Sequence, residues 1–320
     1  MTAGTSVDQE ARPGKIEARP VRHPWRYVGV VIIALLVAMI ISSLVTNERW
    51  DLPFALRVMN YKPIIQGLIQ GTIIGTVGAM IIGIVGGILL AMMRLSENPV
   101  LRGVAFLYTW FFRAIPRLVL LAMLGTGVGY LYPKLDFGLP FSQQITSAFG
   151  MSNDLTFYQL DVNSISNGII IGILGLGLSE AAYMAEIARA GIQSVDRGQS
   201  EAAQALGMSN GKAMRRVILP QAMRVIVPPT GNETIAMVKD TSLLSIVPVT
   251  AELWYQITVV GSRTLKIMPT YVAGFAWYLV ICTILMIGQY FLERRFGRGF
   301  GTTAPGRTRM LGLGSREGGA

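Results

Sequence analysis

The chain has 320 residues, of which 52% are hydrophobic and 14% charged, a composition that is typical of a protein crossing a membrane several times and that excludes an ordinary soluble domain. Its formal charge of +10 comes from Lys and Arg between and beyond the apolar stretches, which argues against a nucleic-acid-binding face. One cysteine and one histidine exclude a disulfide framework and a Cys/His metal cluster.

The first 26 residues are polar and basic and predict a disordered cytoplasmic tail. Residues 27–47 carry no charge and match the roughly 20 residues that a helix needs to cross a bilayer. A long tail precedes this segment and no A-x-A cleavage pattern follows it. We therefore predict a retained N-terminal anchor and not a signal peptide.

Five more apolar stretches follow, at 63–93, 103–132, 162–188, 225–248 and 268–292. Together with the anchor they predict an all-α, polytopic membrane protein with about six transmembrane helices. The first of the five has a small residue at every fourth position: Gly67, Gly71, Gly75, Ala79, Gly83, Gly87 and Ala91. Small residues let a second helix approach closely, so we interpret this ridge as a packing surface.

The distribution of Lys and Arg predicts the orientation of the six crossings. If the N-terminal tail is cytoplasmic, the inner segments hold nineteen of these residues, the outer loops six and the spans three. Because positive residues favour the inside, both termini, including the tail 294–320, are predicted to be cytoplasmic. The longest outer loop, 133–161, is nearly uncharged and fits either a partner surface or a passive insertion.

The longest well-charged, helix-forming stretch between two apolar spans begins at Asp196. Asp196 with Gln199 three positions later forms a capping-box pattern that starts a helix, and Gly207 is expected to end it. Ser209 is expected to cap a second short helix, which Pro220 should stop because proline lacks a backbone donor. We therefore predict two short helices joined by a glycine turn.

Two motifs of soluble proteins compete for residues 196–220 and fail. A DNA-binding helix-turn-helix needs a third helix and a core of its own, whereas this stretch runs into Pro228, Pro229 and a membrane-length span. A phosphate-binding loop needs G-x-x-x-x-G-K-[ST], whereas GMSNGK is one residue short and is followed by Ala213 where a hydroxyl is required.

The stretch reads E-A-A-x3-G and, nine residues later, V-I-L-P, which resembles the EAA loop of the permease subunits of ABC importers. The flanks 181–199 and 219–247, with FFRAIPRLVLL from Phe111, resemble the polar amino acid branch of that family. The resemblance covers residues 63–293. It implies a five-helix permease core that forms the pathway of an ATP-driven amino acid importer in the inner membrane of a bacterium.

The resemblance also implies partners: a cytosolic ABC ATPase, an extracytoplasmic substrate-binding protein, a second permease copy or homologue, and membrane lipid. The chain is expected not to be an enzyme and to hold no cofactor or metal, because the ATPase uses the ATP and no nucleophile, base and orienting group form a set. The coupling element is residues 196–220, with ATPase contacts at Gln199, Glu201, Ala202, Ala203, Gly207 and Pro220. An ordinary solvated loop is the competing interpretation.

Charges inside a span cost about 2.5–3.5 kcal/mol each on insertion scales, so they mark candidate substrate contacts. Arg113 and Lys239 each lie about ten residues into a span, near the bilayer midplane. Asp240, Thr241 and Ser242 follow Lys239. These groups either bind the carboxylate and ammonium of an amino acid, or Asp240 forms a structural ion pair with Lys239 or Arg113.

The family pattern continues the Arg of the third span with Gly-Thr-Pro-Leu, whereas this chain has Ala114, Ile115 and Arg117 in place of Gly, Thr and Leu. The intervening Pro116 is expected to bend the span. Arg117 repels Arg113 unless an anion lies between them, which makes an acidic amino acid the substrate hypothesis to test.

Three further acidic or basic groups lie in the fourth span or at its cytoplasmic end. Glu186 and Arg189 are three residues apart and predict a local surface pair. Glu180 is deeper and has no partner in its own helix. A carrier or channel driven by an ion gradient is the alternative function. It favours repeated halves, and no clear internal repeat is present. A membrane scaffold that only recruits a cytosolic partner is a third hypothesis.

Overall fold

The computed structural model describes residues 24–148, 156–162, 168–247 and 249–296, and it divides the chain after Trp50 into two compact units. The predicted tails lie outside the described residues, except that 24–26 and 294–296 are helical. The first unit holds helix α1 (Pro24–Thr46), which occupies the predicted anchor, and a 3-10 turn at Glu48–Trp50.

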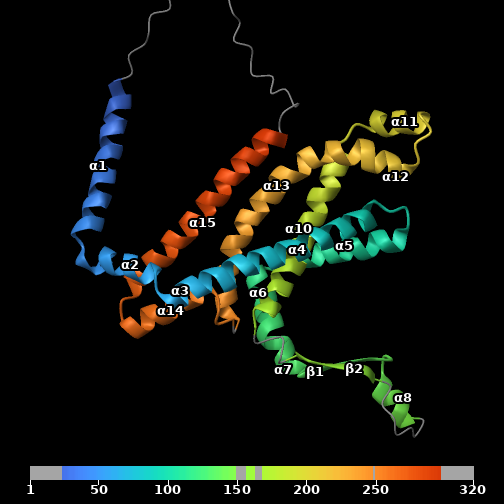
Figure 1. Cartoon of the computed structure of the whole chain (residues 1–320), viewed down its shortest axis with the longest axis horizontal. Helices are drawn as coiled ribbons and strands as arrows, with labels where there is room; N and C mark the ends of the chain where they lie inside the picture. The colour runs from blue at the N-terminus through green and yellow to red at the C-terminus, as the bar shows by residue number, and fades with distance from the viewer. Residues whose placement is uncertain (1–23, 149–155, 163–167, 248, 297–320) are drawn as a thin grey trace, which may run out of the picture. The chain divides into compact units, whose positions relative to one another are not determined.

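The second unit is almost entirely helical (Figure 1). Its helices are α2 (Leu52–Met59), α3 (Lys62–Gly67), α4 (Ile74–Leu95), α5 (Pro99–Ala114), α6 (Arg117–Ala122), α7 (Gly129–Leu131), α8 (Ser142–Ala148), α10 (Ile169–Gln193), α11 (Arg197–Ala205), α12 (Asn210–Ala213), α13 (Leu219–Asp240), α14 (Leu253–Thr264) and α15 (Ile267–Phe296). Wider π-helical turns lie at Leu68–Ile73, Met123–Val128 and Met214–Ile218, and a 3-10 turn at Thr241–Ile246.

Loop 133–161 is the exception to the all-α prediction. Strands β1 (Lys134–Gly138) and β2 (Thr156–Asp161) pair antiparallel, with Lys134 opposite Asp161. Helix α8 lies between them in the chain. The helical class is confirmed, and this loop adds a two-stranded sheet that its turn-rich sequence did not predict.

Four described helices are long and apolar enough to cross a membrane: α1, the continuous helix Lys62–Leu95, α10 and α15. A fifth is counted if α5 and the helix that follows it are one span, although they meet at 99°. Ile115 before Pro116 is extended, because proline disfavours a helical conformation in the preceding residue. The predicted bend is therefore confirmed, and the crossing at 103–132 is not straight.

Helix α13 covers most of the span predicted at 225–248, but it is too polar to be among the candidate membrane-spanning helices. The total of six crossings therefore remains a prediction. The prediction that Pro220 stops the second short helix is wrong. Pro220 lies in the first turn of α13, where its missing donor is tolerated. The π-helical turn before it joins α12 to α13 without a break in helical backbone conformation.

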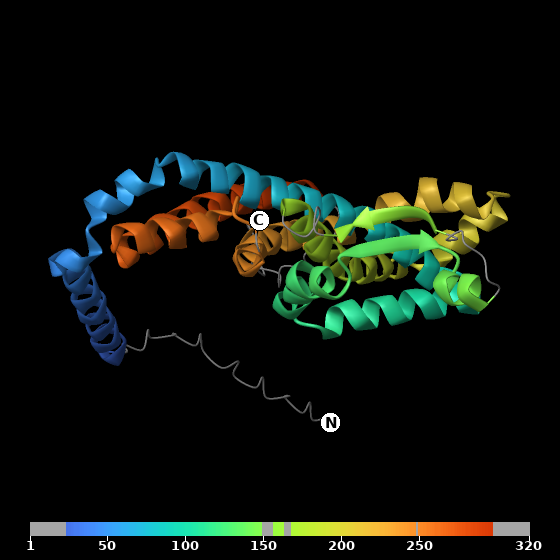
Figure 2. The same cartoon turned by 90° about the horizontal axis from the view of Figure 1, so that it is seen from below.

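The small-residue ridge packs as predicted, and all seven of its members are buried. Gly83 and Gly87 face α10, where a Cβ on Gly83 would come within 2.5 Å of Cγ of Glu180. Gly71 faces the backbone of Ala251 and Glu252. Figure 2 shows α3 and α4 running along much of the length of the second unit, so this ridge is the surface on which α10 and the start of α14 are assembled.

The central core joins the helices that carry the site. Its buried side chains come from α4, α6, α10, α13 and the turn after α13, and include Met80, Leu121, Leu176, Met237 and Leu244. In Figure 1, the α11 and α12 segment lies at one end of α10, and β1 and β2 lie at the other. Helix α10 therefore links the two ends of this unit.

Candidate functional site

Three charged side chains from three different helices meet inside the second unit. Arg117 of α6 contacts Glu180 of α10, with Nη2 2.7 Å from Oε2, and its other terminal nitrogen pairs with Asp240 at the end of α13. Glu180 is fully buried, and the Arg117 side chain is 14% exposed. We call these three residues the charge cluster.

The charge cluster holds one cation and two carboxylates, so it carries an excess negative charge. Glu180 Oε1 is buried and has no hydrogen-bond partner in the part of the chain that the structure describes. The Arg117 guanidinium lies 4.9 Å from the centre of the Tyr183 ring, one turn along α10. A buried carboxylate oxygen without a donor is costly, so the cluster is suited to receive a further cationic group.

The structure separates the residues that were predicted to bind substrate together. Asp240 does form an ion pair, but its partner is Arg117. The expected partners were Lys239 or Arg113. Lys239 is exposed and makes no ion pair with the described residues. The partner was missed because it lies 123 residues away along the chain and on a different helix.

Two hydroxyls of the predicted set lie in the 3-10 turn after α13 and donate to backbone carbonyls of α13. Thr241 is buried and donates to the carbonyl of Val238 at 2.7 Å. Ser242 donates to the carbonyl of Lys239 at the same distance. Such bonds satisfy the last carbonyls of α13, so these hydroxyls end the helix at the charge cluster.

Arg113 lies in a separate pocket of about 460 Å³ between α4, α5 and α10. We call it the arginine pocket, and its lining includes Arg94, Phe106, Trp110, Arg113, Tyr183 and Glu186. The predicted pair of Glu186 and Arg189 is confirmed at 2.6 Å, and Arg94 approaches the other oxygen of Glu186 at 3.4 Å. The ring of Tyr183 also lies 5.6 Å from the Arg113 guanidinium.

The segment 196–220 forms the predicted helical hairpin, with its first cap as expected. Asp196 Oδ1 accepts from the backbone N–H of Gly198 at 2.6 Å and starts α11. The capping box is incomplete, because the Gln199 side chain accepts from Gln221 at 3.2 Å instead of reaching back. This bond ties α11 to the start of α13. Ser209 stands at the N-cap of α12 but makes no side-chain capping bond.

Gly207 ends α11, as predicted, in a left-handed conformation with φ of +75°. The N–H of Gly207 donates to the carbonyl of Gln204 at 2.9 Å, and that of Met208 to the carbonyl of Ala203 at 3.0 Å. This pair of backbone hydrogen bonds is a Schellman motif, which fixes the turn and favours glycine at position 207.

The hairpin presents most of the predicted contact residues to the outside. Gln199, Glu201, Ala202, Gly207 and Pro220 are exposed. Ala203 is buried within the unit, so it packs the hairpin instead of facing out. Leu206 is 83% exposed and was not predicted. The sequence did contain a signal for this exposed leucine: it is an apolar residue at the end of a polar helix, just before the glycine that ends the helix.

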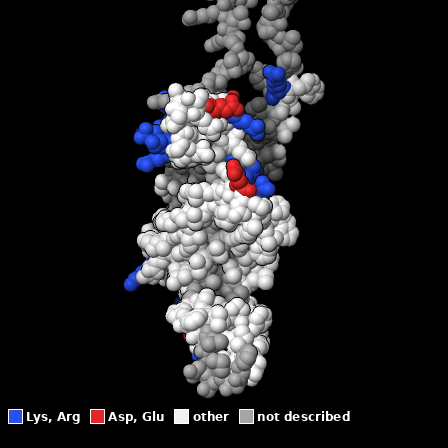
Figure 3. All heavy atoms as spheres, turned by 90° about the vertical axis from the view of Figure 1, so that its right-hand side faces the viewer, with Lys and Arg blue, Asp and Glu red and all other residues white. Residues whose placement is uncertain are grey.

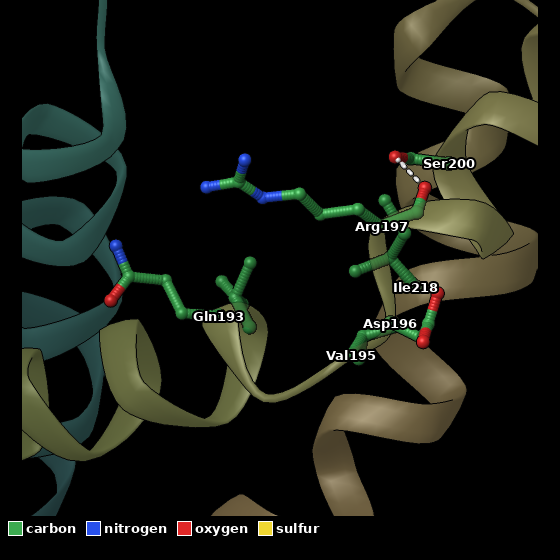
Figure 4. Close-up of a pocket in the computed structure, with 7 residues that line it drawn as sticks. Gln193, Val195, Asp196, Arg197, Ser200 and Ile218 are labelled. Atoms are coloured by element: carbon green, nitrogen blue, oxygen red, sulfur yellow. Dashed lines mark hydrogen bonds between the residues drawn. The ribbon is translucent and has the colours of Figure 1, made fainter.

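A pocket of about 470 Å³ lies where α10 turns into the hairpin. Figure 4 shows the Arg197 side chain extending across it toward Gln193, with Val195 and Ile218 on the hairpin side. Figure 3 shows charged residues gathered mainly on the part of the visible face that includes the hairpin, above a broad surface that is nearly free of charge. The hairpin is therefore a polar projection from an apolar body.

Comparisons with known proteins agree on one class. The family model described as "Binding-protein-dependent transport system inner membrane component" matches residues 83–298. The arginine transport system permease protein ArgU of Corynebacterium glutamicum is 42% identical over 311 residues, which cover 96% of this chain and 91% of that protein. The glutamate/aspartate import permease protein GltK of Escherichia coli O157:H7 is 33% identical over a region that covers 73% of this chain and 95% of that protein.

A solved structure gives the same result. The crystal structure titled as an amino acid ABC transporter with histidines matches with a TM-score of 0.57 and 33% identity. The match covers 73% of this chain and 94% of that chain.

Proposed function

This chain belongs to the family of binding-protein-dependent transport system inner membrane components and is the permease subunit of an ABC-type amino acid importer, and from that premise we propose that it carries basic amino acids past the charge cluster. It is a multi-pass membrane protein and not itself an enzyme. Its family implies an ATPase and a substrate-binding protein as partners. The relatives do not favour a carrier driven by an ion gradient.

The observation that supports a basic substrate is the unpartnered Oε1 of Glu180 beside Asp240. Both carboxylates already accept a guanidinium, that of Arg117, so their geometry suits one. The cationic side chain of an amino acid can bind the free oxygen or take the place of Arg117. Exposed Lys239, on the same turn as Asp240, offers a charge for the carboxylate of the substrate.

The acidic substrate expected from the sequence has less support. That hypothesis needed Arg113 and Arg117 to be free cations near each other. Arg117 is neutralised by two carboxylates, and Arg113 lines the arginine pocket, whose lining does not include Arg117. The name of the relative at 42% identity supports the basic class.

The hairpin 196–220 is proposed as the docking element for the ATPase. Its exposed residues Gln199, Glu201, Ala202, Gly207 and Pro220 support this role, and Leu206 adds an apolar anchor. A rigid turn at the end of the capped helix α11 can transmit a displacement to α13, which carries Asp240. We further propose assembly with a second permease copy or homologue in the bacterial inner membrane, since one subunit forms half a pathway.

Transport in sealed vesicles tests the substrate class. The chain is reconstituted with its ATPase and binding protein, and ATP-dependent uptake of labelled arginine is compared with that of labelled glutamate. We expect arginine to be taken up and Glu180→Gln to lower its uptake by about 10- to 100-fold, as for the loss of a charged hydrogen bond worth about 1.5–3 kcal/mol.

Glu97→Gln is the matched control, because Glu97 is exposed in the turn between α4 and α5. It should leave uptake unchanged. Glutamate uptake in place of arginine uptake, or equal uptake by Glu180→Gln and the wild type, contradicts the proposal.

A further inference from the structure

The arginine pocket has more positive than negative charge. Its lining has two guanidinium groups, of Arg94 and Arg113, and one carboxylate, of Glu186, which also pairs with Arg189 at its edge. Arg189 takes this carboxylate through two bonds of 2.6 and 2.9 Å, whereas Arg94 makes one contact of 3.4 Å. The charge of Glu186 is therefore mainly paired with Arg189, and the positive charges of Arg94 and Arg113 remain poorly neutralised.

Two donors in this pocket lack acceptors within the described residues. The Nε atom of Arg94 is buried and has no hydrogen-bond partner among them. Arg113 has no carboxylate of the described residues within 4.0 Å, and its guanidinium lies over the Tyr183 ring. The buried Nε–H group of Arg94 is costly without an acceptor, and the exposed Arg113 guanidinium is accessible to an anion, so an oxyanion with several oxygens can accept from both arginines.

The mouth of the pocket is apolar. Phe106 is 54% and Trp110 58% exposed, and Leu107 beside them on α5 is 60% exposed. In a protein that spans a membrane, such a face contacts acyl chains or another apolar surface. An oxyanion that is attached to acyl chains matches both the arginines inside and the apolar rim.

The position along α4 places the Arg94 end of the pocket at the level of lipid headgroups. Arg94 is the second-last residue of the 34-residue helix Lys62–Leu95, which is long enough to cross the bilayer. Its guanidinium also stacks on Phe106, 5.1 Å from the ring centre. An arginine near the end of a span is placed to reach the lipid headgroups.

We infer from these observations that the arginine pocket binds the phosphate of an anionic phospholipid, with Arg94 and Arg113 as its ligands and Phe106 and Trp110 against the first carbons of the acyl chains. The site is distinct from the charge cluster and does not depend on which amino acid is carried. A phosphate or a carboxylate from solution has the same chemistry, so the source of the anion is part of the test.

Native mass spectrometry of the full-length permease with its ATPase tests this inference. Phosphatidylglycerol and phosphatidylcholine with identical acyl chains are titrated onto the delipidated complex in neutral detergent. Phosphatidylglycerol is expected to bind more tightly. Arg113→Gln should weaken its binding about five-fold, as for the loss of about 1 kcal/mol per cation, and Arg113→Lys should retain most of it.

Arg102→Gln is the matched control, since Arg102 is an exposed arginine on the same helix as Arg113. It should bind phosphatidylglycerol as the wild type does. Arg94→Gln serves as a second variant and should also weaken binding. Arg113 makes no ion pair with the described residues, so its variants keep the test valid if Arg94→Gln does not fold.

Equal binding of the two lipids overturns the inference, and so does an equal loss in Arg102→Gln and Arg113→Gln. Inorganic phosphate, arginine and glutamate form the second arm. If one of them binds the wild type, loses its binding in Arg113→Gln and is not displaced by phosphatidylglycerol, the pocket takes an anion from solution and the lipid assignment is wrong.

Discussion

Arg117 neutralises two carboxylates that come from α10 and α13, so its removal should leave both without a cation. Breaking a buried ion pair by removing one partner costs about 3–5 kcal/mol. We expect Arg117→Met to lower the unfolding free energy by this order, measured as a fall in the melting temperature of the purified permease. A melting temperature equal to that of the wild type would argue against the cluster.

The double variant Arg117→Met with Glu180→Gln should recover part of this loss, because it removes the buried charge that the first change leaves unpaired. Arg102→Met is the control on the exposed part of α5 and should change stability by no more than about 0.5 kcal/mol.

Asp51 illustrates a charge pair outside the spans. It caps α2, and the Lys266 ammonium donates to its Oδ2 at 2.6 Å, which lowers the pKa of the Asp51 carboxyl below its ordinary value of 3.8. A lowered pKa contributes stability that is present above pH 3.8 and is lost as the pH falls through the folded-state value.

Asp51→Asn retains the capping oxygen and removes the charge. It should melt slightly below the wild type at pH 7, and the difference should shrink as the pH falls below 3.8 and through the folded-state pKa, as followed by thermal denaturation. Lys266→Met should show the same dependence. A difference that does not shrink at all as the pH is lowered to full protonation of the carboxyl would mean that the cap, and not the charge, stabilises this end.

At the scale of elements, the contact between α4 and α10 depends on the absence of side chains. A Cβ on Gly83 would lie 2.5 Å from Cγ and 2.8 Å from Cβ of Glu180. We expect Gly83→Ala to destabilise the permease by about 1–3 kcal/mol through overpacking, measured by thermal denaturation. Gly103→Ala on α5 meets no atom within 4 Å and should be neutral or slightly stabilising, as alanine favours a helix.

The turn of the hairpin provides a test of coupling. A Cβ at Gly207 would meet no atom within 4 Å, so the main cost of a side chain there is the backbone strain of about 1–2 kcal/mol at φ of +75°. We expect Gly207→Val to leave the permease folded and to uncouple ATP hydrolysis from uptake, both measured in vesicles. Gly211→Val, in open space with ordinary backbone, is the control, and normal coupling in Gly207→Val would exclude this turn as the lever.

For the whole molecule, the orientation in the membrane can be read by chemical labelling. The hairpin and the β strands lie at opposite ends of α10 (Figure 1), and the free cysteine Cys282 is buried. In right-side-out vesicles, a membrane-impermeant thiol reagent should label Phe157→Cys and leave Glu201→Cys unlabelled until the vesicles are opened. The reverse pattern would place the hairpin outside and remove its role in docking an ATPase.

The sequence alone was sufficient for features that depend on neighbours along the chain. The membrane class and the packing ridge follow from hydrophobic runs and residue spacing. The end of α11 at Gly207 follows from backbone preference, and the bend at Pro116 from the ring of proline. The family resemblance rests on the same short-range pattern in residues 196–220.

Tertiary structure alone decided which charges meet. Arg117 lies 63 residues from Glu180 and 123 from Asp240, and no local periodicity encodes that α6, α10 and α13 converge. The 99° angle after α5 likewise sends Arg113 to its own pocket, away from Asp240. Buried charges choose their partners by the packing of whole helices, because only a water-excluded interior makes an unpaired carboxylate costly enough to fix the pairing.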